Sequence, residues 1–303
     1  MTWSSNEARV ALAGRLREDH PEWEADEPVL MGGGLEFFVF RIQSARQGPL
    51  AIKVPRAPIF INDNDPRVVA RDLLEQEAAL ISRAARGGIP VPRLVALELG
   101  REPLDYLVLE YVEHAGGEPS PRALGELVRR LHSLPELPSR PLVAQQGRPL
   151  AELLAERIHR RARVVERLAG VRLALPGPEW LADVLHGSER PRAVLHMDVR
   201  PANVLAREGQ VLALLDWSNA LVGDPALELA RIAEYGLAGP EFLAAYHGLE
   251  PLPPPPARLE LLYRIDTAVM LAVVFLSEQP DAEKARPQVA RVVELCGRLE
   301  GTR

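Results

Sequence analysis

The periodicity of the apolar residues changes near residue 113, and this change limits what the chain can fold into. Before it, apolar runs rich in β-branched and aromatic residues are separated by turns, as in FFVFRI at 37–42, PLAIKV at 49–54 and YLVLEYV at 106–112. Such runs predict antiparallel strands. After it, the spacing of three and four residues that is typical of helices dominates, as in RALGELVRRLHSL at 122–134. The sequence therefore predicts an α+β protein in which a small antiparallel sheet precedes a larger, mostly helical part.

The boundary between the two parts coincides with a segment of linker composition. This segment, HAGGEPSP at 114–121, contains the glycine and proline residues of an irregular connection. Upstream, VVARDLLEQEAALISRAA at 68–85 has helical spacing and predicts the main helix of the first part. We therefore predict an N-terminal domain of residues 1–112 and a C-terminal domain of residues 113–303, with a hinge at about 110–115.

The charge and the cysteine content exclude several classes of protein. The 303 residues carry a net charge of −6 with acids and bases interspersed, so we expect no broad basic surface for nucleic acid. Cys296 is the only cysteine, which excludes an intramolecular disulfide and a thiolate zinc cluster. No signal peptide is recognisable, and the longest apolar run, AVMLAVVFL at 268–276, is too short to span a bilayer. We therefore expect a cytoplasmic protein without nucleic-acid or membrane partners.

Acidic and amide side chains recur in the stretch from 194 to 225, VLHMDVRPANVLAREGQVLALLDWSNALVGDP. A short hairpin within it would bring Asp198, Asn203 and Asp216 together. A carboxylate that accepts a hydroxyl proton during phosphoryl transfer lies beside the groups that hold Mg²⁺, and Mg²⁺ takes few ligands from protein, mainly oxygens. Taken alone, however, Asn203 and Asp216 are equally consistent with the capping of turns.

A lysine in the middle of an apolar strand provides a second signal. Lys53 lies in LAIKV at 50–54, where burial of its charge would require an anionic partner. Glu77 on the following helix is the candidate partner, with Glu75 as the rival, and the pair could bind the α- and β-phosphates of a nucleotide. The turn before the second strand contains three consecutive glycines, Gly32, Gly33 and Gly34. Such a run lets backbone amides approach phosphate closely, although a plain β-turn is the simpler interpretation.

In the order glycine turn, strand lysine, helix glutamate, hinge, HMDVRPAN and a later aspartate, these motifs resemble the protein-kinase-like superfamily. The resemblance is to its aminoglycoside phosphotransferase branch of small-molecule kinases and extends from Val29 to the C-terminal helices. It rests on LAIK, EQEAALISRAARGGIPVPRL, LVLEYV, LGELVRRLHSLP, LHMDVRPANVL and LLDWSNALVGDPALELARI. It implies a bilobal protein-kinase-like fold, with a small antiparallel sheet and one main helix in the N-terminal lobe and a mostly helical C-terminal lobe.

The resemblance also implies roles for individual residues. Asp198 would be the catalytic base, and Arg200, in the place of the catalytic-loop lysine of protein kinases, would contact the γ-phosphate. Asn203 and Asp216 would hold Mg²⁺. ATP, with GTP not excluded, would be the nucleotide, and its adenine would contact the Glu110 carbonyl, the Val112 amide and Ala51. The complete set of nucleotide-binding residues would be Gly32, Gly33, Gly34, Ala51, Lys53, Glu77, Glu110 and Val112.

Several positions differ from regulated protein kinases and from many antibiotic kinases. Only seven residues separate Asp216 from Asp224, which leaves no room for a long activation segment. Asp224 and Pro225 predict the N-cap and the first residue of the next helix. Met197 stands where many relatives have a glycine, and Arg200 stands where they have a histidine.

Three further polar residues near these motifs are interpreted as structural. His196 is a tempting base or metal ligand, but in this family the loop histidine more often anchors the backbone. His132, at the end of an apolar-periodic helix, is also assigned a structural role. Glu36 follows the glycine turn and would repel phosphate, so we expect it to face solvent.

The acceptor is indicated only by acids in the C-terminal helices. Glu228, Glu234 and Asp266 would suit a cationic acceptor such as an aminoglycoside. The alternatives are that they are ordinary surface carboxylates, or that Asp266 pairs with Arg264. The predicted function is ATP-dependent phosphoryl transfer to a hydroxyl group of a small molecule, with an aminoglycoside or another antibiotic as the candidate acceptor and antibiotic resistance as the corresponding role. The alternative functions are a kinase of the choline, homoserine, sugar or nucleoside type, a protein kinase, and an ATP-binding pseudokinase.

Overall fold

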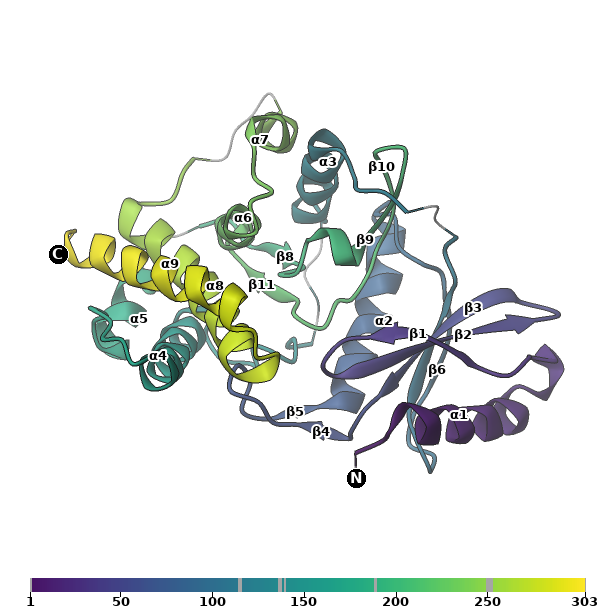
Figure 1. Cartoon of the computed structure of the whole chain (residues 1–303). Coiled ribbons are helices and arrows are strands. Elements are labelled where there is room, and N and C mark those ends of the chain that lie inside the picture. Colours follow the sequence, from purple (N-terminus) through teal and green to yellow (C-terminus); the bar gives the residue numbers. More distant parts are fainter. Residues whose placement is uncertain are drawn as a thin grey trace. The chain divides into compact units, whose positions relative to one another are not determined.

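The computed structural model describes residues 2–113, 116–135, 138, 140–187, 190–248 and 253–302 (Figure 1). The chain forms two compact units, each considered by itself. Unit 1 comprises the described residues of Met1–Ile61, Arg67–Glu118 and Asn203–Ser218, and unit 2 comprises those of Asn62–Pro66, Pro119–Ala202 and Asn219–Arg303. Residues 114 and 115 of the predicted hinge and linker lie outside the described residues, and the predicted domain boundary between 112 and 113 stays a prediction.

Unit 1 is built on a five-stranded antiparallel sheet with the strand order β1-β2-β3-β7-β6. Its strands are β1 (Val29–Gly33), β2 (Phe37–Ser44), β3 (Gly48–Pro55), β6 (Leu94–Glu98) and β7 (Tyr106–Glu110). The other elements are α1 (Ser5–Asp19), η1 (Pro21–Trp23), β4 (Ile59–Phe60), β5 (Val68–Val69), α2 (Ala70–Arg86), β9 (Val204–Arg207) and β10 (Gln210–Leu214). The register places Lys53 opposite Val39 on one side and Leu107 on the other, so the lysine lies on the central strand.

Helices cover both faces of this sheet (Figure 1). α1 shares an apolar core with Phe40, Ile52 and Val108 of the strands. Because successive side chains of a strand point to opposite faces, Lys53 points away from α1. On that second face it meets Glu77 of α2. The predicted helix at 68–85 is thus confirmed as α2, with ends that differ by one or two residues.

A hairpin from the second half of the chain belongs to unit 1. β9 and β10 pair antiparallel, with Val204 opposite Leu214. The Leu214 N–H donates to the Pro90 carbonyl at 2.8 Å, which fixes the hairpin to the segment that follows α2. This is the short hairpin that the stretch from 194 to 225 predicted.

Unit 2 is mostly helical. Its elements are α3 (Pro121–His132), α4 (Leu150–Ala169), α5 (Pro178–His186), β8 (Ala193–Leu195), β11 (Leu221–Gly223), α6 (Pro225–Glu234), α7 (Pro240–His247), α8 (Ala257–Val273), the π-helical η3 (Val274–Glu278) and α9 (Ala282–Glu300). The 3₁₀ turn η2 (Pro201–Asn203) leads out of it toward β9. β8 and β11 form a two-stranded antiparallel sheet, and α8 runs beside α9 (Figure 1). The core contains apolar residues of α4, α5, α8 and α9, and the apolar run at 268–276 contributes Ala268 and Val269 to it.

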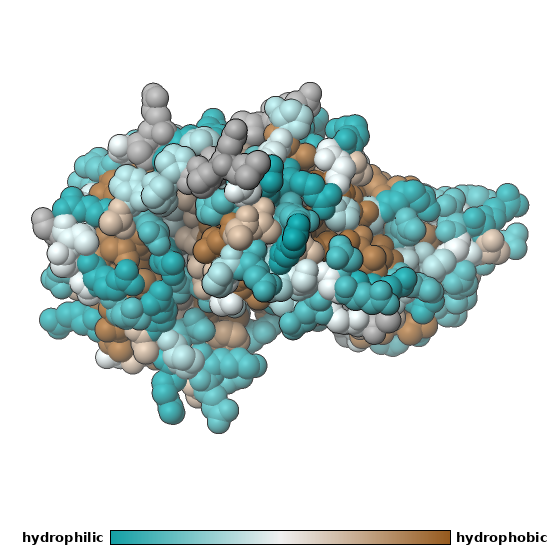
Figure 2. Space-filling view, turned by 90° about the horizontal axis from the view of Figure 1, so that it is seen from above, coloured by the Kyte–Doolittle hydropathy of each residue, from teal (hydrophilic) through white to brown (hydrophobic). Residues whose placement is uncertain are grey.

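The face in Figure 2 is mainly hydrophilic, with hydrophobic residues in small groups. None of the described helices combines the length and the hydrophobicity needed to cross a bilayer. The predicted α+β fold class, with a small antiparallel sheet and many helices, is confirmed.

Candidate active site

Lys53 is held between two carboxylates in unit 1. Its Nζ donates to Glu77 Oε2 at 2.6 Å and to Asp216 Oδ1 at 2.9 Å. Lys53 and Glu77 are buried, whereas the side chain of Asp216 is 41% exposed. Burial opposes the lysine charge, but the carboxylates of Asp216 and Glu77 outweigh this effect and raise the pKa of Lys53. The lysine is therefore a permanent cation beside a carboxylate that solvent and ligands can reach.

The helical period decides which glutamate pairs with this lysine. Residues two positions apart on a helix face different sides. Glu77 is buried against the sheet, and Glu75 is exposed. Glu77 is thus the ion-pair partner, as the sequence predicted. The ring of Phe37 adds a further contact, with its centroid 4.4 Å from the Lys53 Nζ.

Asn203 directly precedes β9, and Asp216 is the second residue after β10. The Leu215 N–H donates to the Asn203 carbonyl at 2.8 Å, so the residue before β9 and the residue after β10 lie at the same end of the hairpin. Asp216 has a φ of 61°, a left-handed conformation that is uncommon outside glycine and recurs at functional sites. No group of three or more His, Cys, Asp and Glu side chains suited to a metal occurs in the described part of the chain. An amide and a carboxylate nevertheless fit Mg²⁺, which takes few protein ligands and keeps water and phosphate as the others.

Two residues that the sequence analysis missed hold the segment after Asp216. Ser218 Oγ donates to Asp216 Oδ1 at 2.7 Å. Gln76 Nε2 donates to the carbonyls of Trp217 and Ser218, at 2.9 and 3.2 Å. Gln76 directly precedes Glu77, so one turn of α2 contacts both the lysine and the segment that carries Asp216. The only available signal was a polar residue on the buried side of a predicted amphipathic helix.

The glycine turn has a backbone reason at two of its three positions, and at Gly32 it is a φ of 156°, which residues with a side chain rarely adopt. A Cβ on Gly33 would lie 2.3 Å from the Phe37 carbonyl oxygen, so only glycine fits there. Gly32 pairs with Val39 in the β1–β2 ladder, and Gly34 accepts a hydrogen bond from Arg56 Nε at 2.9 Å. The role of the three glycines in phosphate binding stays a prediction. Glu36, which we expected to face solvent, is half-buried.

The residues predicted to contact adenine lie on adjacent strands of the unit 1 sheet. The β3–β7 register places Ala51 opposite Leu109, next to Glu110 at the end of β7. The Glu110 N–H donates to the Arg93 carbonyl at 2.9 Å, and Val112 follows two residues later. The structure therefore brings Ala51 and Glu110 together, and their contact with a nucleotide stays a prediction.

Asp198 lies in the loop after β8, in unit 2. Its Oδ1 accepts hydrogen bonds from Arg200 Nε and from the Tyr235 hydroxyl, both at 3.0 Å. Asp198 is buried, while the side chain of Arg200 is 48% exposed. Burial, reinforced by the charge of Asp198, raises the pKa of Tyr235, so its hydroxyl stays protonated and donates. Tyr235 belongs to no motif of the sequence and was not predicted.

Glu228, one of the acids predicted to bind the acceptor, contacts the loop that carries Asp198. Its carboxylate is fully buried and accepts the N–H groups of His196, at 3.2 Å, and Met197, at 2.5 Å. His132 Nε2 lies 2.7 Å from the same carboxylate. Burial opposes the charge, but these contacts lower the pKa of Glu228. His196 Nδ1 accepts the Asp198 N–H at 3.2 Å, which agrees with the predicted anchoring role of this histidine.

Met197 shows why many relatives have a glycine at this position. Its φ of 64° lies in the left-handed region, which glycine adopts without strain and methionine does not. Contacts on both sides stabilise the strained peptide, because Glu228 accepts its N–H and Arg231 Nη1 donates to its carbonyl at 2.6 Å. Methionine thus stands at a left-handed position where those relatives have a glycine.

The other two acids predicted to bind an acceptor are also paired within unit 2. Glu234 accepts hydrogen bonds from Arg264 at 2.8 Å and from Arg291 at 2.9 Å. The interpretation that Arg264 pairs with Asp266 is wrong, because residues two apart on α8 face different sides. The interpretation as surface carboxylates is also wrong for Glu228 and Asp266, which are 0% exposed. All three acids have partners inside unit 2, and their binding of an acceptor stays a prediction.

Asp224 begins α6, as the Asp-Pro pair predicted. Its Oδ1 accepts the Ala226 N–H at 3.0 Å in a helix N-cap. Its Oδ2 accepts hydrogen bonds from Arg190 at 2.7 Å and from the Tyr263 hydroxyl at 3.2 Å. These contacts confirm the structural role that we assigned to this residue.

A comparison with protein families places this arrangement in a known group. The family model described as "Phosphotransferase enzyme family" matches residues 29–262, which is more than half of the chain. The chain therefore belongs to this phosphotransferase family. A search of curated proteins found no match.

Solved structures share the fold at low sequence identity. A Haemophilus somnus protein assigned as a fructosamine-3-kinase has a TM-score of 0.66 and 14% identity, with 96% of this chain and 97% of that chain covered. The aminoglycoside phosphotransferase APH(4)-Ia, in a ternary complex with AMP-PNP and hygromycin B, has a TM-score of 0.63 and 14% identity, with 94% and 97% covered. A choline/ethanolamine kinase family protein from Mesorhizobium loti has a TM-score of 0.60 and 19% identity, with 89% and 88% covered.

These matches confirm the resemblance that the sequence motifs indicated. The fold is the protein-kinase-like fold of these aminoglycoside phosphotransferases, and the protein is a phosphotransferase.

Proposed function

We propose that the protein transfers the γ-phosphoryl group of ATP to a hydroxyl group of a small molecule. The observation that carries this proposal is the position of Lys53, between Glu77 at 2.6 Å and Asp216 at 2.9 Å. Phosphoryl transfer depends on positioning and on charge stabilisation, and this arrangement offers a fixed cation for phosphate oxygens beside a half-exposed carboxylate for a metal. A related aminoglycoside phosphotransferase has been seen with AMP-PNP, which supports ATP as the nucleotide, with GTP as the alternative.

The nucleotide would bind to unit 1. Adenine would contact the Glu110 carbonyl, the Val112 amide and the side chain of Ala51, and the glycine turn and Lys53 would contact the phosphates. Asn203 and Asp216 would hold Mg²⁺, whose charge would offset that of the β- and γ-phosphates. The fit of their oxygen donors and their position at one end of a hairpin support this assignment.

Asp198 would act as the base. The acceptor hydroxyl would lose its proton to the Asp198 carboxylate while its oxygen forms a bond to the γ-phosphorus. The bond from this phosphorus to the β–γ bridging oxygen would break, and ADP would leave with that oxygen. Tyr235 and Arg200 both donate to Asp198 Oδ1, so they would orient the carboxylate, and the half-exposed Arg200 would also contact the γ-phosphate.

Two biological roles follow from the range of related proteins. One relative was studied with hygromycin B, which supports an antibiotic as the acceptor and a role in resistance. Others are assigned to fructosamine and to choline or ethanolamine, which supports a metabolite kinase. The predicted cytoplasmic location stays a prediction.

The test is ADP release from ATP with a panel of aminoglycosides, macrolides, nucleosides, sugars and amino alcohols. We expect Asp198→Asn to lower turnover of the best acceptor by about 10²–10⁴-fold, because the general base is lost, while ATP binding is unchanged. Asp183→Asn changes the same functional group at an exposed position of α5 and serves as the control. Full turnover by Asp198→Asn would show that the proton goes elsewhere.

A further inference from the structure

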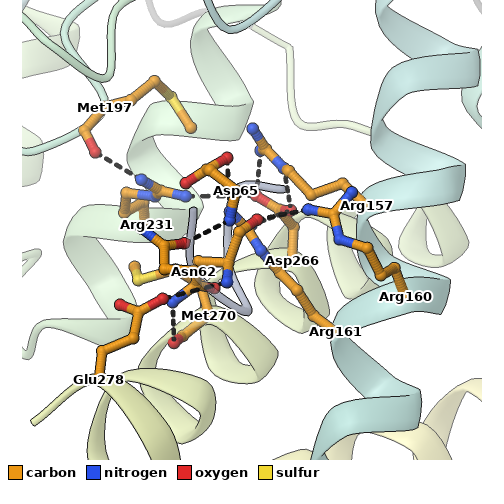
Figure 3. A network of polar contacts seen from close by, with 11 residues as sticks. Asn62, Asp65, Arg157, Arg160, Arg161, Met197, Arg231, Asp266, Met270 and Glu278 are labelled. Carbon is orange, nitrogen blue, oxygen red and sulfur yellow. Dashed lines mark hydrogen bonds and ion pairs between the residues drawn. The ribbon is translucent and has the colours of Figure 1, made fainter. Parts of the chain in front are cut away.

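Four arginines of unit 2 form a cluster with few acids to balance them. The arginine cluster consists of Arg157, Arg160 and Arg161 of α4 and Arg231 of α6. Figure 3 shows Arg157 and Arg231 pointing toward Asp266 of α8 from two different helices. Three of the four guanidinium groups, all but that of Arg160, bind this one carboxylate.

Three arginines share the carboxylate of Asp266 at unequal distances. Arg157 makes a bidentate contact with Asp266, at 2.8 and 2.6 Å. Arg161 and Arg231 each reach it at 3.3 Å. These three arginines and the aspartate are less than 10% exposed. Although burial opposes its charge, the arginines lower the pKa of Asp266 to about 2, so it supplies one full negative charge.

The remaining acids near the arginine cluster do not balance the other charges. Asp65 is 3.8 Å from Arg161, and its side chain is 41% exposed. The other nearby acids have partners of their own: Asp63 binds Ser277 and Arg167, Glu156 binds Arg148, and Glu278 accepts the Asn64 N–H. Burial also raises the pKa of Glu278, which weakens its negative charge. Burial opposes the charge of Arg231, but Tyr235, Asp266, Asp198 and Glu228 outweigh this effect and raise its pKa. The positive excess therefore lies on the arginines of α4, and burial together with Arg157 lowers the pKa of Arg161 to about 9.

Several buried donors of the cluster have no hydrogen-bond partner among the residues that the structure describes. They are the Nε groups of Arg160, Arg161 and Arg231. An unpaired N–H of a buried guanidinium is costly, and an acceptor that carries negative charge is its natural partner. The cluster therefore has both the charge and the free donors of a site for an anionic group.

The arginine cluster adjoins the loop that carries the proposed base. Arg231 Nη1 donates to the carbonyl of Met197, the residue before Asp198. Tyr235, four residues after Arg231, donates to Asp198 itself. Side chains four apart on a helix lie side by side, with Cβ atoms about 5–6 Å apart. The arginine cluster and Asp198 are therefore connected through Met197 and one turn of α6.

We propose that the phosphoryl acceptor is a compact hydroxyl compound with a carboxylate or phosphate group, and that this anionic group binds to the arginine cluster in place of Asp65. The inference rests on the proposed function and reverses the charge expected of the acceptor. The carboxylates that were predicted to bind a cation already have partners. Asp65 is the weakest partner in the cluster and the most exposed, so an incoming anion displaces it first.

The first experiment measures ADP release with two series of related hydroxyl compounds, each with anionic, neutral and cationic members. One set is glycerate, glycerol 3-phosphate, glycerol and 2-amino-1,3-propanediol, and the second is gluconate, glucose 6-phosphate, glucose and glucosamine. We expect an anionic member to exceed its neutral counterpart in kcat/KM by at least about tenfold, and the cationic member to be the poorest. The carboxylate and phosphate arms show which anion is preferred. A preference for the cationic members would overturn the proposal.

The second experiment measures anion binding without turnover, so that it stands apart from the proposed function. Calorimetry with malonate and with inorganic phosphate, each with and without AMP-PNP, gives the affinity of the site. We expect Asp65→Asn to tighten binding by about fivefold, because a competing carboxylate is removed. Asp63→Asn makes the same change of charge on the same loop, at a residue paired with Ser277, and is expected to have no effect.

Arg161→Met is the complementary variant, with an expected loss of at least about tenfold in anion affinity. Because Arg161 is buried, the folding of the Arg161→Met variant has to be checked. If this variant does not fold, the anion affinity of Asp65→Asn alone tests the proposed site. Absence of malonate and phosphate binding in both the wild type and Asp65→Asn would overturn the proposal. Failure of AMP-PNP to bind while these anions bind would instead overturn the proposed function.

Discussion

The two units each contain a buried cluster of charges, and the two clusters have opposite net charge. In unit 1, one lysine, Lys53, lies between the carboxylates of Glu77 and Asp216. In unit 2, three arginines share the carboxylate of Asp266. Buried charges are unfavourable unless they are compensated, so each imbalance indicates the sign of a missing partner. The first cluster is suited to a metal cation and the second to an anion.

The clusters also differ in where they meet solvent. In unit 1 the excess charge lies on Asp216, whose side chain is 41% exposed and can take a metal. In unit 2 the excess charge lies on arginines that are less than 10% exposed, and the half-exposed residue is the acid Asp65. A metal would therefore be added to the first cluster, whereas the proposed anion would replace the Asp65 carboxylate in the second.

The largest expected effect is on the stability of unit 2. Asp266→Asn removes the carboxylate that three buried arginines share, and we expect a loss of about 3–5 kcal/mol in the free energy of unfolding. Urea denaturation measures this loss. Glu260→Gln, an exposed carboxylate on the same helix, is the control and should cost less than about 1 kcal/mol. Equal effects of the two variants would mean that the arginines of the cluster are compensated in another way.

Removal of the cation from the unit 1 cluster is expected to affect activity more than folding. Lys53→Met should lower kcat for phosphoryl transfer by about 10²–10³-fold, equivalent to about 3–4 kcal/mol, because a fixed charge at the phosphates is lost. ADP release at saturating ATP measures the change. Lys284→Met, at an exposed lysine of α9, is the matched control. Wild-type kcat in Lys53→Met would contradict the role of this cluster in catalysis.

Acid should weaken the arginine cluster in a defined pH window. The pKa of Asp266 is about 2 in the folded state, against 3.8 as the ordinary value. The charged form is therefore favoured by folding, and its contribution is complete above about pH 4 and lost as the pH falls toward 2. The difference corresponds to about 2 kcal/mol of unfolding free energy. Urea denaturation between pH 5 and about 2.5 should show this decline in the wild type, and Asp266→Asn should lack this part of it.

The smallest expected effect concerns the orientation of Asp216. Ser218→Ala removes the hydroxyl that donates to Asp216 Oδ1 at 2.7 Å. We expect kcat to fall by about five- to tenfold and the Mg²⁺ concentration for half-maximal activity to rise, because a hydrogen bond to a partly exposed carboxylate contributes about 1 kcal/mol. Ser218→Thr keeps the hydroxyl and should restore both values. An unchanged Mg²⁺ dependence in Ser218→Ala would limit Ser218 to a structural role.

The sequence was sufficient to predict features that depend on the local geometry of a single helix or strand. An apolar strand with one lysine and a following amphipathic helix named Glu77 as the candidate partner of Lys53, with Glu75 as the rival that the structure then excluded. An aspartate followed by proline predicted the start of α6 at Asp224. Each of these inferences depends only on which side of one element a residue faces.

The sequence was insufficient where a partner lies far along the chain. Arg264, two residues from Asp266, was considered as its partner, but the actual partners come from α4 and α6, and Arg157 is 109 residues away. Tyr235 was missed for the same reason, since 37 residues separate it from Asp198. No periodicity within one helix indicates which residue of another helix it will meet.

By itself, the sequence thus predicted the main strands and helices, because these follow from periodicity and caps. Its motifs carried the resemblance to the phosphotransferase family, which the family comparison then showed. The tertiary structure decided which charges are buried together, because that depends on how helices far apart in the chain pack. It also decided that the acids of α6 and α8 are already paired. The sign of the charge that this protein can still bind was therefore visible only in the folded chain.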